Sequence, residues 1–555
     1  MANILAWNIA HDSSVAYLEN GRLKFFCKEE RLSRIKRDKH PFKSLELFRS
    51  LNLNPDHILY MTPTNNELDI FSTYGAYSIK FFGSNAENYS NLNHHSAHAT
   101  FAFCNSGFEE ALIFVIDRNG SLFFVKEEAV AREAESVYVA SRKSKHISPI
   151  YKNFFLNANE AYSTSIESII KTAYPRSCEV HAKSQYGIVT AYEAATTLIG
   201  QHPLENGKTM GLSSYCNKTE FEPLFYNGFV DSKYFMKDVG ELNNSLKFLG
   251  VCFRGEHDKI TQRVTTDNHQ YYSEKAKHVQ IETQKAAANL IRTHVNKTGI
   301  KNVCIVGGYG LNVVANQYYL QQLPDVNFYF EPCADDTGVS IGGAMLKHLE
   351  VTGDMPQGTR SKFYHHYEDD YNITGLGDKT TIKEIVEILQ NQKSVAIFEG
   401  SPESGPRALG HRSILFDPRN SDTKNIVNKI KKREWYRPFA GVMLESDLND
   451  YFEDLGINSS EDMTINFQAL PDTVKNYPGV IHVDGSCRIQ TVNSGFLFNL
   501  ISQFKIKTGS PILLNTSFNL AGEPLVHYKK DAIHTFYNSD LDYLLFVDEM
   551  ILLKK

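Results

Sequence analysis

The chain has 555 residues, of which 42% are hydrophobic and 22% charged, and its formal net charge is −6 at pH 7. This composition indicates a globular protein of about two to four domains and excludes a fibrous or wholly disordered chain. The acidic balance provides no general attraction to nucleic acid or to an anionic membrane. The apolar runs are far shorter than the roughly 20 residues of a membrane span. The start of the chain has no signal-peptide pattern, and the eight cysteines form no CxxC pair, so we expect a cytoplasmic protein without membrane contact.

The first 130 residues predict two similar units of strand, loop and strand. In each unit an apolar strand leads into a loop of acidic and small residues and then into a second strand. Two such loops that face one another are typical of proteins that hold nucleotide phosphates, although one repeat by itself also fits an ordinary β-meander. The predicted strands are 4–7, 14–18, 23–27, 111–116 and 122–125.

Further along the chain, strands alternate with helices, which predicts sheets with helices packed on their faces. The polar segment 353–371, rich in Gly, Pro, His and Asp, is typical of a linker between two α/β domains. Before it we expect a helix over 280–295, a strand over 303–306, a helix from about 311 and a strand over 328–330. After it we expect a strand over 394–398, helices over 423–431 and 495–504, and a strand over 511–514.

The segment Asn93–His98 contains three histidines just before an apolar run that favours a helix. On a helix His94 and His98 lie one turn apart on the same face, so that both can bind one metal ion. Asp117, at the end of an apolar strand, can add a carboxylate. Mixed histidine and carboxylate ligands suit iron or another transition metal, with zinc as an alternative. The competing interpretation is that these histidines are capping or surface residues.

Two glycine-rich segments are candidates for nucleotide binding. In the first, Gly307, Gly308 and Asn312 lie where a strand turns into a helix, and such a turn exposes backbone N–H groups to phosphate or ribose. The segment matches neither a Walker loop nor a GxGxxG fingerprint, and its glycines also fit tight packing. In the second, Lys208 and Gly211 lie among hydroxyl side chains, a pattern that suits a nucleotide or an ordinary loop equally well.

The second predicted domain is rich in cations beside glycine, proline and aromatic residues. Guanidinium groups held in this way suit phosphate and carboxylate oxygens, which they can bind with two hydrogen bonds. We therefore predict a phosphate-type pocket rather than a solvated basic surface. Its candidate residues are Arg407, Arg412, Lys432, Arg433, Arg437 and Arg488, with Asn515 and Ser517 after a buried strand.

Together these segments resemble the NodU/CmcH/TobZ family of O-carbamoyltransferases over nearly the whole chain. The resemblance implies an α/β protein with a duplicated Kae1-like domain of the actin/Hsp70 (ASKHA) type over 1–352, a linker over 353–378 and a YrdC-like α/β domain over 379–555. The matching stretches are His11-Asp12-Ser13-Ser14, Glu29-Glu30-Arg31, HHSAHA (94–99), GKTMGLSSY (207–215), GGYGLN (307–312), GPRALGHRS (405–413), KKREWYRPF (431–439), DGSCR (484–488) and LNTSFNLAGEP (514–524).

The resemblance implies a reaction in two steps. In the YrdC-like domain, carbamoyl phosphate and ATP with Mg²⁺ give carbamoyl adenylate, pyrophosphate and phosphate. In the Kae1-like domain an acceptor hydroxyl takes the carbamoyl group and AMP leaves. The resemblance assigns phosphate contacts to the second-domain cations, and to Ser517 the carbamoyl end of the intermediate.

The resemblance also implies a metal site of His94, His98, Asp117 and one late aspartate, for Fe(II) or another divalent transition metal. We expect Asp336 to be that late ligand, with Asp335 as the alternative. The metal would act as a Lewis acid. His11 and Asp12 are the candidates to orient or deprotonate the acceptor hydroxyl.

Alternative functions are a tRNA-modifying enzyme of the threonylcarbamoyl-adenosine type and a nucleotide-binding regulatory protein of the same fold. A sugar kinase would leave the arginine-rich second domain without a role, and a hydrogenase-maturation enzyme would carry CxxC zinc motifs. The acceptor can be a sugar or other secondary metabolite, a nucleotide, or a hydroxymethylated base in DNA. The resemblance further suggests a homodimer. The cations that can face an anionic acceptor, or form a solvated surface, are Arg31, Arg34, Lys36, Arg37 and Lys39.

Overall fold

The computed structural model describes residues 2–9, 11–61, 82, 86–89, 93–124, 130–157, 163–183, 187–226, 229–230, 264–359, 363–364 and 366–555. The chain divides into two compact units. The first unit comprises Met1–Thr62, Glu67–Tyr89 and Glu331–Lys555, and the second comprises Pro63–Asn66 and Ser90–Phe330. This division differs from the predicted boundary near residue 352, because the beginning of the chain packs with its C-terminal part.

The N-terminal residues of the first unit form a five-stranded sheet in the order β3-β2-β1-β4-β5. Strands β1, β2 and β3 are antiparallel, β4 is parallel to β1, and β5 is parallel to β4. Helix α12 covers this sheet so closely that a Cβ atom on Gly343 would lie 2.8 Å from Sδ of Met61. The elements are β1 (Asn3–Asn8), β2 (Ser14–Glu19), β3 (Arg22–Lys28), α1 (Glu29–Ser33), α2 (Phe42–Ser50), β4 (His57–Met61), β5 (Glu87–Asn88) and α12 (Val339–Thr352).

The second unit has a seven-stranded sheet in the order β10-β9-β8-β6-β13-β14, with β7 paired to β8. Strands β6, β8 and β9 are antiparallel, whereas β13 and β14 continue the sheet in parallel beside β6. Both sheets therefore have three antiparallel strands followed by two parallel ones. The strands are β6 (Glu110–Ile116), β7 (Leu122–Phe124), β8 (Val130–Ser141), β9 (His146–Asn157), β10 (Glu179–Lys183), β13 (Asn302–Val306) and β14 (Asn327–Phe330), and a separate hairpin consists of β11 (Phe225–Tyr226) and β12 (Phe229–Val230).

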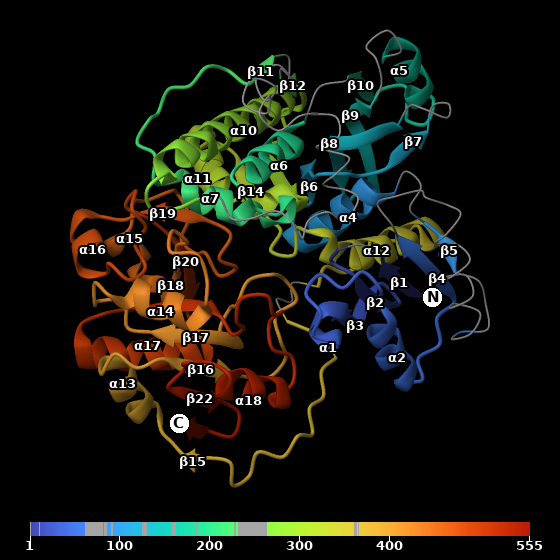
Figure 1. Cartoon of the computed structure of the whole chain (residues 1–555). Helices are drawn as coiled ribbons and strands as arrows, with labels where there is room; N and C mark the ends of the chain where they lie inside the picture. The colour runs from blue at the N-terminus through green and yellow to red at the C-terminus, as the bar shows by residue number, and fades with distance from the viewer. Residues whose placement is uncertain are drawn as a thin grey trace. The chain divides into compact units, whose positions relative to one another are not determined.

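Helices pack against this seven-stranded sheet and against one another. Helix α4 contacts β6 and β13, while α10 contacts α6, α7 and α11 (blue to yellow-green in Figure 1). The predicted helix over 280–295 lies within α10. The helices are α4 (His94–Ser106), α5 (Ser163–Lys171), α6 (Ile188–Leu198), α7 (Asn206–Ser213), α10 (His269–Thr298) and α11 (Val313–Gln322), with short 3₁₀ turns η2 (Pro203–Glu205) and η5 (Gly308–Leu311).

The C-terminal part of the first unit is a nine-stranded sheet between two layers of helices (orange to red in Figure 1). Alternate residues of β16 enter different cores: Val395 and Ile397 pack with α13 and α17, whereas Ala396 and Phe398 pack with α14 and α18. This period of two explains why the strand is apolar throughout. The strands are β15 (Asp378–Lys379), β16 (Val395–Phe398), β17 (Arg412–Phe416), β18 (Ala440–Leu444), β19 (Asn466–Gln468), β20 (Ser486–Val492), β21 (Ile512–Ser517), β22 (Tyr543–Phe546) and β23 (Ile551–Lys554).

Two helices of this part, and one helix of the second unit, were predicted from the sequence in position or in part. Helix α14 has the predicted bounds, α17 extends the predicted helix by one turn, and α4 of the second unit begins at the first of the paired histidines. No helix of the described residues is both long and apolar enough to span a bilayer. The helices are α13 (Ile382–Gln390), α14 (Thr423–Lys431), α15 (Leu448–Tyr451), α16 (Pro471–Asn476), α17 (Gly495–Thr508) and α18 (Lys529–Tyr537), with 3₁₀ turns η6 (Asp336–Gly338) and η7 (Glu445–Asp447).

The described part of the segment predicted as a linker contacts both the N-terminal and the C-terminal parts of the first unit. The Tyr364 hydroxyl accepts a hydrogen bond from the backbone N–H of Lys28 at 2.9 Å, and its ring meets Phe26 edge-on. Tyr367 donates to the carbonyl oxygen of His527 at 3.0 Å. These contacts explain why the N-terminal sheet and the C-terminal sheet belong to one compact unit.

Candidate functional site

Helix α4 presents two buried histidines on one face. His94 and His98 are one turn apart in the first turns of the helix, and neither is exposed to solvent. Their ring centroids are 5.0 Å apart and the rings are nearly perpendicular. The helix predicted from the apolar run after the histidines therefore gives the spacing that two metal ligands need.

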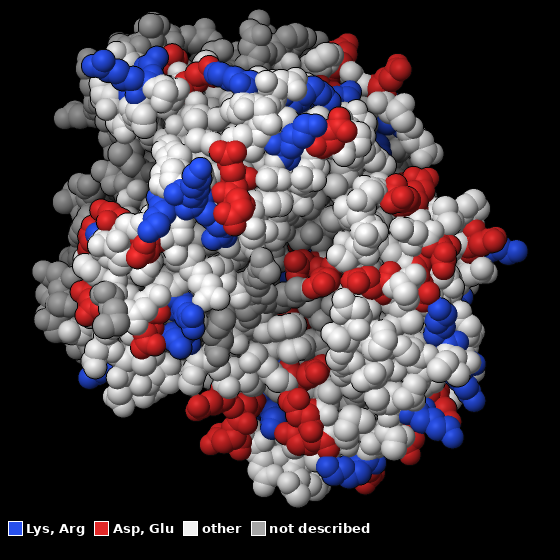
Figure 2. Space-filling view, turned by 180° about the vertical axis from the view of Figure 1, so that it is seen from behind, with Lys and Arg blue, Asp and Glu red and all other residues white. Residues whose placement is uncertain are grey.

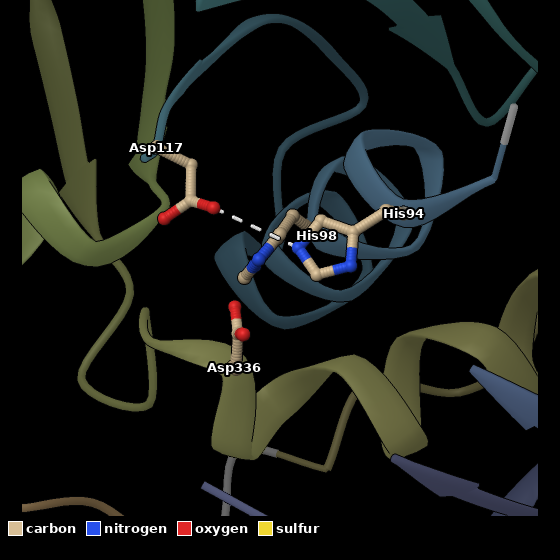
Figure 3. A group of neighbouring side chains, drawn as sticks. All are labelled: His94, His98, Asp117 and Asp336. Carbon is tan, nitrogen blue, oxygen red and sulfur yellow. Dashed lines mark ion pairs between the residues drawn. The ribbon is translucent and has the colours of Figure 1, made fainter. Parts of the chain in front are cut away.

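Asp117 directly follows β6 and points toward these histidines (Figure 3). Its Oδ2 lies 3.6 Å from Nε2 of His94, while its Oδ1 accepts a hydrogen bond from the backbone N–H of Gly308 at 2.9 Å. Gly307 brings the two strands together: its φ is 88°, and a Cβ atom there would lie only 2.5 Å from the carbonyl oxygen of Ile116. The glycine-rich segment thus holds the aspartate in place as well as connecting β13 to η5.

The ligand atoms of His94, His98 and Asp117 in the second unit lie within 4.8 Å of one another, and all three side chains are buried (Figure 3). Asp336, the expected fourth ligand, is buried in η6 of the first unit. Ligand atoms that share one ion at about 2.1 Å are at most about 4.2 Å apart, so a small contraction would bring the three to bonding distance. Two imidazoles with two carboxylates fit a divalent transition metal better than calcium or magnesium, which prefer oxygen ligands alone. The carboxylate of Asp335 instead accepts from the Thr337 N–H at 3.1 Å and caps η6.

His11 and Asp12 form a chain of contacts with a lysine that the sequence had not suggested. Nδ1 of His11 lies 2.6 Å from Oδ2 of Asp12, whose Oδ1 lies 2.6 Å from Nζ of Lys28. Burial opposes ionisation of Asp12, yet the Lys28 ammonium and His11 hold its pKa well below the usual range. Nε2 of His11 lies 3.9 Å from Oδ2 of Asp336. The signal for Lys28 was its place at the end of an apolar strand, where a lysine needs a buried partner.

The residues predicted to bind nucleotide in the first predicted domain occupy helices and caps. Lys208 lies in α7 and contacts Gln201 at 3.0 Å and Glu205 at 2.8 Å, and Gly211 is buried in the same helix. Asn312 caps α11, with its Oδ1 accepting from the Ala315 N–H at 3.1 Å. The structure therefore gives Lys208 and Asn312 protein partners.

In the nine-stranded sheet, strand register gathers the predicted anion-binding segments at one end. Arg488 on β20 is opposite Ala440 on β18, and Ala440 is opposite Asn515 on β21. Ser517, at the end of β21, is opposite Ser413 at the start of β17. The loops that precede β17, β18 and β20 and the loop that follows β21 consequently meet at the same edge. These loops contain the sequence segments that had been predicted to form the pocket.

The cations at this edge repel one another. Burial together with Arg407 lowers the pKa of Arg488, with Arg433 and Arg437 adding to the effect. Burial lowers the pKa of Arg407 to about 10, a shift that Asp335 opposes and Arg437 reinforces. The buried Nε atom of Arg488 has no hydrogen-bond partner among the described residues. Such a cluster is costly without an anion and is stabilised when one binds.

The lysine that the structure brings to this edge is Lys431, whereas Lys432, the residue predicted from the sequence, is exposed. Helix α14 ends at Lys431, and Lys432 turns away from it with a φ of 51°. Nζ of Lys431 contacts the carbonyl oxygen of Ser517 and both oxygens of Asn519, the latter at 2.6 and 2.8 Å. Burial, followed by Arg433 and Arg437, lowers its pKa well below the usual range.

Two other predicted arginines make their hydrogen bonds within the protein. Arg412 is fully buried, and its two terminal nitrogens donate to four backbone carbonyl oxygens at 2.7–3.1 Å. Arg433 donates to Asn428 at 2.8 Å and to the carbonyl oxygen of Pro438 at 2.7 Å, and it lies over the ring of Phe439. Both arginines hold the loops at this edge of the sheet in place. The sequence alone does not distinguish this structural role from contact with phosphate. The amide nitrogen of Asn515 likewise donates to Gln490 at 2.8 Å.

Two of the five N-terminal cations are engaged with the protein, whereas Lys36 and Lys39 are exposed. Arg31 is buried and donates to the carbonyl oxygen of Gly405 at 3.2 Å. Arg34 donates to the carbonyl oxygens of Leu525 and Pro524 at 2.6 and 3.1 Å. On the face drawn in Figure 2, basic and acidic side chains are interspersed, unlike the basic stripe of a typical nucleic-acid site.

Comparison with known proteins identifies the family of this chain. The family model described as Carbamoyltransferase N-terminus matches residues 67–345, and that described as Carbamoyltransferase C-terminus matches residues 386–554. Nodulation protein NolNO of Sinorhizobium fredii is 27% identical over 96% of this chain and 78% of its own length. Nodulation protein NolO of Bradyrhizobium diazoefficiens is 27% identical over 82% of this chain and 77% of its own length.

Among solved structures, full-length HypF in its phosphate- and nucleotide-bound form covers 63% of this chain and 47% of its own, with 14% identity and a TM-score of 0.38. This structural likeness is weak and adds nothing to the family matches. The two family models together extend over both units of the chain. The chain therefore belongs to the carbamoyltransferase family and is a carbamoyltransferase enzyme.

Proposed function

We propose that the protein is an ATP-dependent O-carbamoyltransferase, which makes carbamoyl adenylate from carbamoyl phosphate and ATP and transfers the carbamoyl group to an acceptor hydroxyl. The observation that carries this proposal is the cluster of mutually repelling cations at one end of the nine-stranded sheet. Burial and the neighbouring arginines lower the pKa values of Arg407 and Arg488, and the negative charge of a polyphosphate would relieve this repulsion. We propose this edge as the adenylate-forming site of a YrdC-like domain over 379–555.

The donor reaction has a simple balance. Water and carbamoyl phosphate give carbamate and phosphate, and a carbamate oxygen then attacks the α-phosphorus of ATP. The bond between the α-phosphorus and the bridging oxygen breaks, and pyrophosphate leaves with Mg²⁺. In this proposal the guanidinium groups neutralise the charge that develops on the leaving group, and Ser517 holds the carbamoyl end. We propose that Lys431 positions the loop after β21 through its contacts with Ser517 and Asn519.

For the transfer step we propose a metal site of His94, His98, Asp117 and Asp336, for Fe(II) or another divalent transition metal. When bound, such an ion supplies Lewis-acid polarisation of the group under attack. Asp12, paired with Lys28, holds the Nδ1 side of His11, so that Nε2 can take the proton of the acceptor hydroxyl. The hydroxyl oxygen attacks the carbamoyl carbon, the bond from that carbon to the adenylate oxygen breaks, and AMP leaves.

The fold assignment for residues 1–352 belongs to this proposal. The five-stranded and seven-stranded sheets have the same order of three antiparallel and two parallel strands, which supports two halves of a duplicated actin/Hsp70-type domain. The acceptor is a hydroxyl-bearing molecule. Because Arg31 and Arg34 are engaged with protein carbonyl groups, we favour a small-molecule acceptor over DNA. A homodimer remains part of the proposal as an expectation from the family resemblance.

The test is pyrophosphate release from ATP by purified protein with and without carbamoyl phosphate. We expect release only when both substrates are present, and a loss of about 100-fold or more in Arg488→Met, since one lost charge-stabilising donor typically costs that much. Lys429→Met is the matched control, because it removes an exposed cation from α14. ATP binding without carbamoyl phosphate-dependent release, or equal rates in both variants, would contradict the proposal.

A further inference from the structure

A buried pair of opposite charges lies behind the two histidines of α4, away from the residues assigned to metal or substrate. Glu133 on β8 and Lys152 on β9 are completely buried and form an ion pair. Nζ of Lys152 also lies 2.5 Å from the Tyr138 hydroxyl. Burying two charges is expensive and is more easily explained by a geometric role than by stability alone.

One side of this pair reaches the helix that carries the histidines. His95, between the two ligand candidates, contacts the Ser136 hydroxyl through Nδ1 at 2.7 Å, and Ser136 donates to Oε1 of Glu133 at 2.9 Å. The neighbouring Ser96 hydroxyl lies 3.2 Å from the hydroxyl of Tyr138. Two consecutive residues of the first turn of α4 are thus connected to the pair, so its rotation and depth are fixed at the turn where His94 and His98 project.

The other side of the pair reaches the loop that begins at Asp117. Oε2 of Glu133 accepts from the Ser121 N–H at 2.9 Å, and the Glu133 backbone exchanges hydrogen bonds with Gly120 and Ser121 at 2.8 and 3.0 Å. Space at this point is minimal, since a Cβ atom on Gly120 would lie 2.5 Å from Glu133 and 2.6 Å from the His95 ring. The loop and α4 are therefore held against the same carboxylate.

We propose that Glu133, with Lys152, is a positioning residue of the metal site, and that His95 belongs to this support rather than to the ligand set. The carboxylate holds α4 and the Asp117 loop at the separation that lets two imidazoles and one aspartate bind the same ion. Partners of this kind behind metal ligands set ligand orientation, and their loss typically costs about 10–100-fold in metal affinity. This inference rests on the metal site of the proposed function.

The experiment measures Co²⁺ affinity by chelator competition, together with the visible absorption spectrum of bound Co²⁺, which reports coordination geometry. In Glu133→Gln we expect affinity to fall about 10–100-fold and the spectrum to change. Glu135→Gln is the matched control: Glu135 is buried on the same strand, but its carboxylate bonds Asn153 at 2.7 Å and the Ile188 N–H at 2.6 Å. We expect its Co²⁺ affinity and spectrum to match the wild type.

Ser136→Ala keeps the ion pair and the direct contact of 3.3 Å between His95 Nδ1 and Glu133 Oε1, but it removes the hydroxyl that bridges these two side chains. It therefore decides the question if Glu133→Gln does not fold. We expect weaker Co²⁺ binding in this variant with near-normal thermal stability. Wild-type affinity and spectrum in the folded Glu133→Gln and Ser136→Ala proteins would overturn the inference while leaving the metal site intact. If the wild type binds no Co²⁺, or His98→Ala binds it equally well, the proposed metal site itself fails, and the inference fails with it.

Discussion

Gly307→Ala is the substitution whose effect the structure defines best. Gly307 has φ 88° and ψ 162°, a region that is essentially restricted to glycine and costs other residues about 1–3 kcal/mol. The methyl group of an alanine at this position would lie 2.5 Å from the carbonyl oxygen of Ile116. Overpacking of this kind costs about 1–3 kcal/mol more. We expect a loss of roughly 4 kcal/mol in the free energy of unfolding.

The control is Gly299→Ala, because Gly299 has a φ of 75° at the end of α10 but no atom within 4 Å of an added Cβ. It isolates backbone strain, for which we expect about 1 kcal/mol. Urea unfolding gives the free energy of unfolding of both variants. We also expect Gly307→Ala to change Co²⁺ affinity, because a shift of Ile116 moves the adjacent Asp117. Equal destabilisation of both variants, or unchanged Co²⁺ affinity in Gly307→Ala, would refute this account of the glycine.

Two further predictions concern the C-terminal sheet. Burial, together with Asp548 and Glu403, raises the pKa of Glu399 from 4.5 to about 7. Between these pH values the folded protein keeps a proton that the unfolded chain loses. The free energy of unfolding should therefore fall by roughly 3 kcal/mol as pH rises from 4.5 to 7. Urea unfolding at both pH values should show this fall in the wild type and not in Glu399→Gln. Arg412→Lys cannot satisfy four carbonyl groups and should lower the free energy of unfolding by about 2–3 kcal/mol, whereas an unchanged melting temperature would argue against those hydrogen bonds.

The sequence predicted the elements whose patterns are local. The alternating or apolar runs at 4–7, 14–18 and 23–27 became β1, β2 and β3, and the histidine spacing became one face of α4. Strands β8 and β9 were not predicted. Their residues are polar and charged at several buried positions, among them Glu133, Lys152 and Glu135. Those charges are tolerated only because each has a partner from another strand, a pairing that no local pattern reveals.

The candidate site shows the same limit. The sequence singled out the segment Lys431–Phe439, but whether Lys431 or Lys432 faces the pocket depends on where α14 ends. It grouped Arg412 with Arg488, although Arg412 bonds four carbonyl oxygens and Arg488 lies among cations. The arginines have different roles because their contacts come from residues that are distant in sequence. Composition and motif order therefore identify the segments that form the pocket, but not the role of each arginine.

The central claim is that carbamoyl adenylate is formed on the protein and consumed by an acceptor hydroxyl. Its most direct test is rapid acid quench with ¹³C-carbamoyl phosphate and ATP, followed by mass spectrometry of the nucleotide fraction. The account predicts AMP bearing one ¹³C-carbamoyl group together with equal amounts of pyrophosphate, lost in Arg488→Met. Carbamoyl transfer to an acceptor without pyrophosphate release, or release of ADP in place of pyrophosphate, would contradict it.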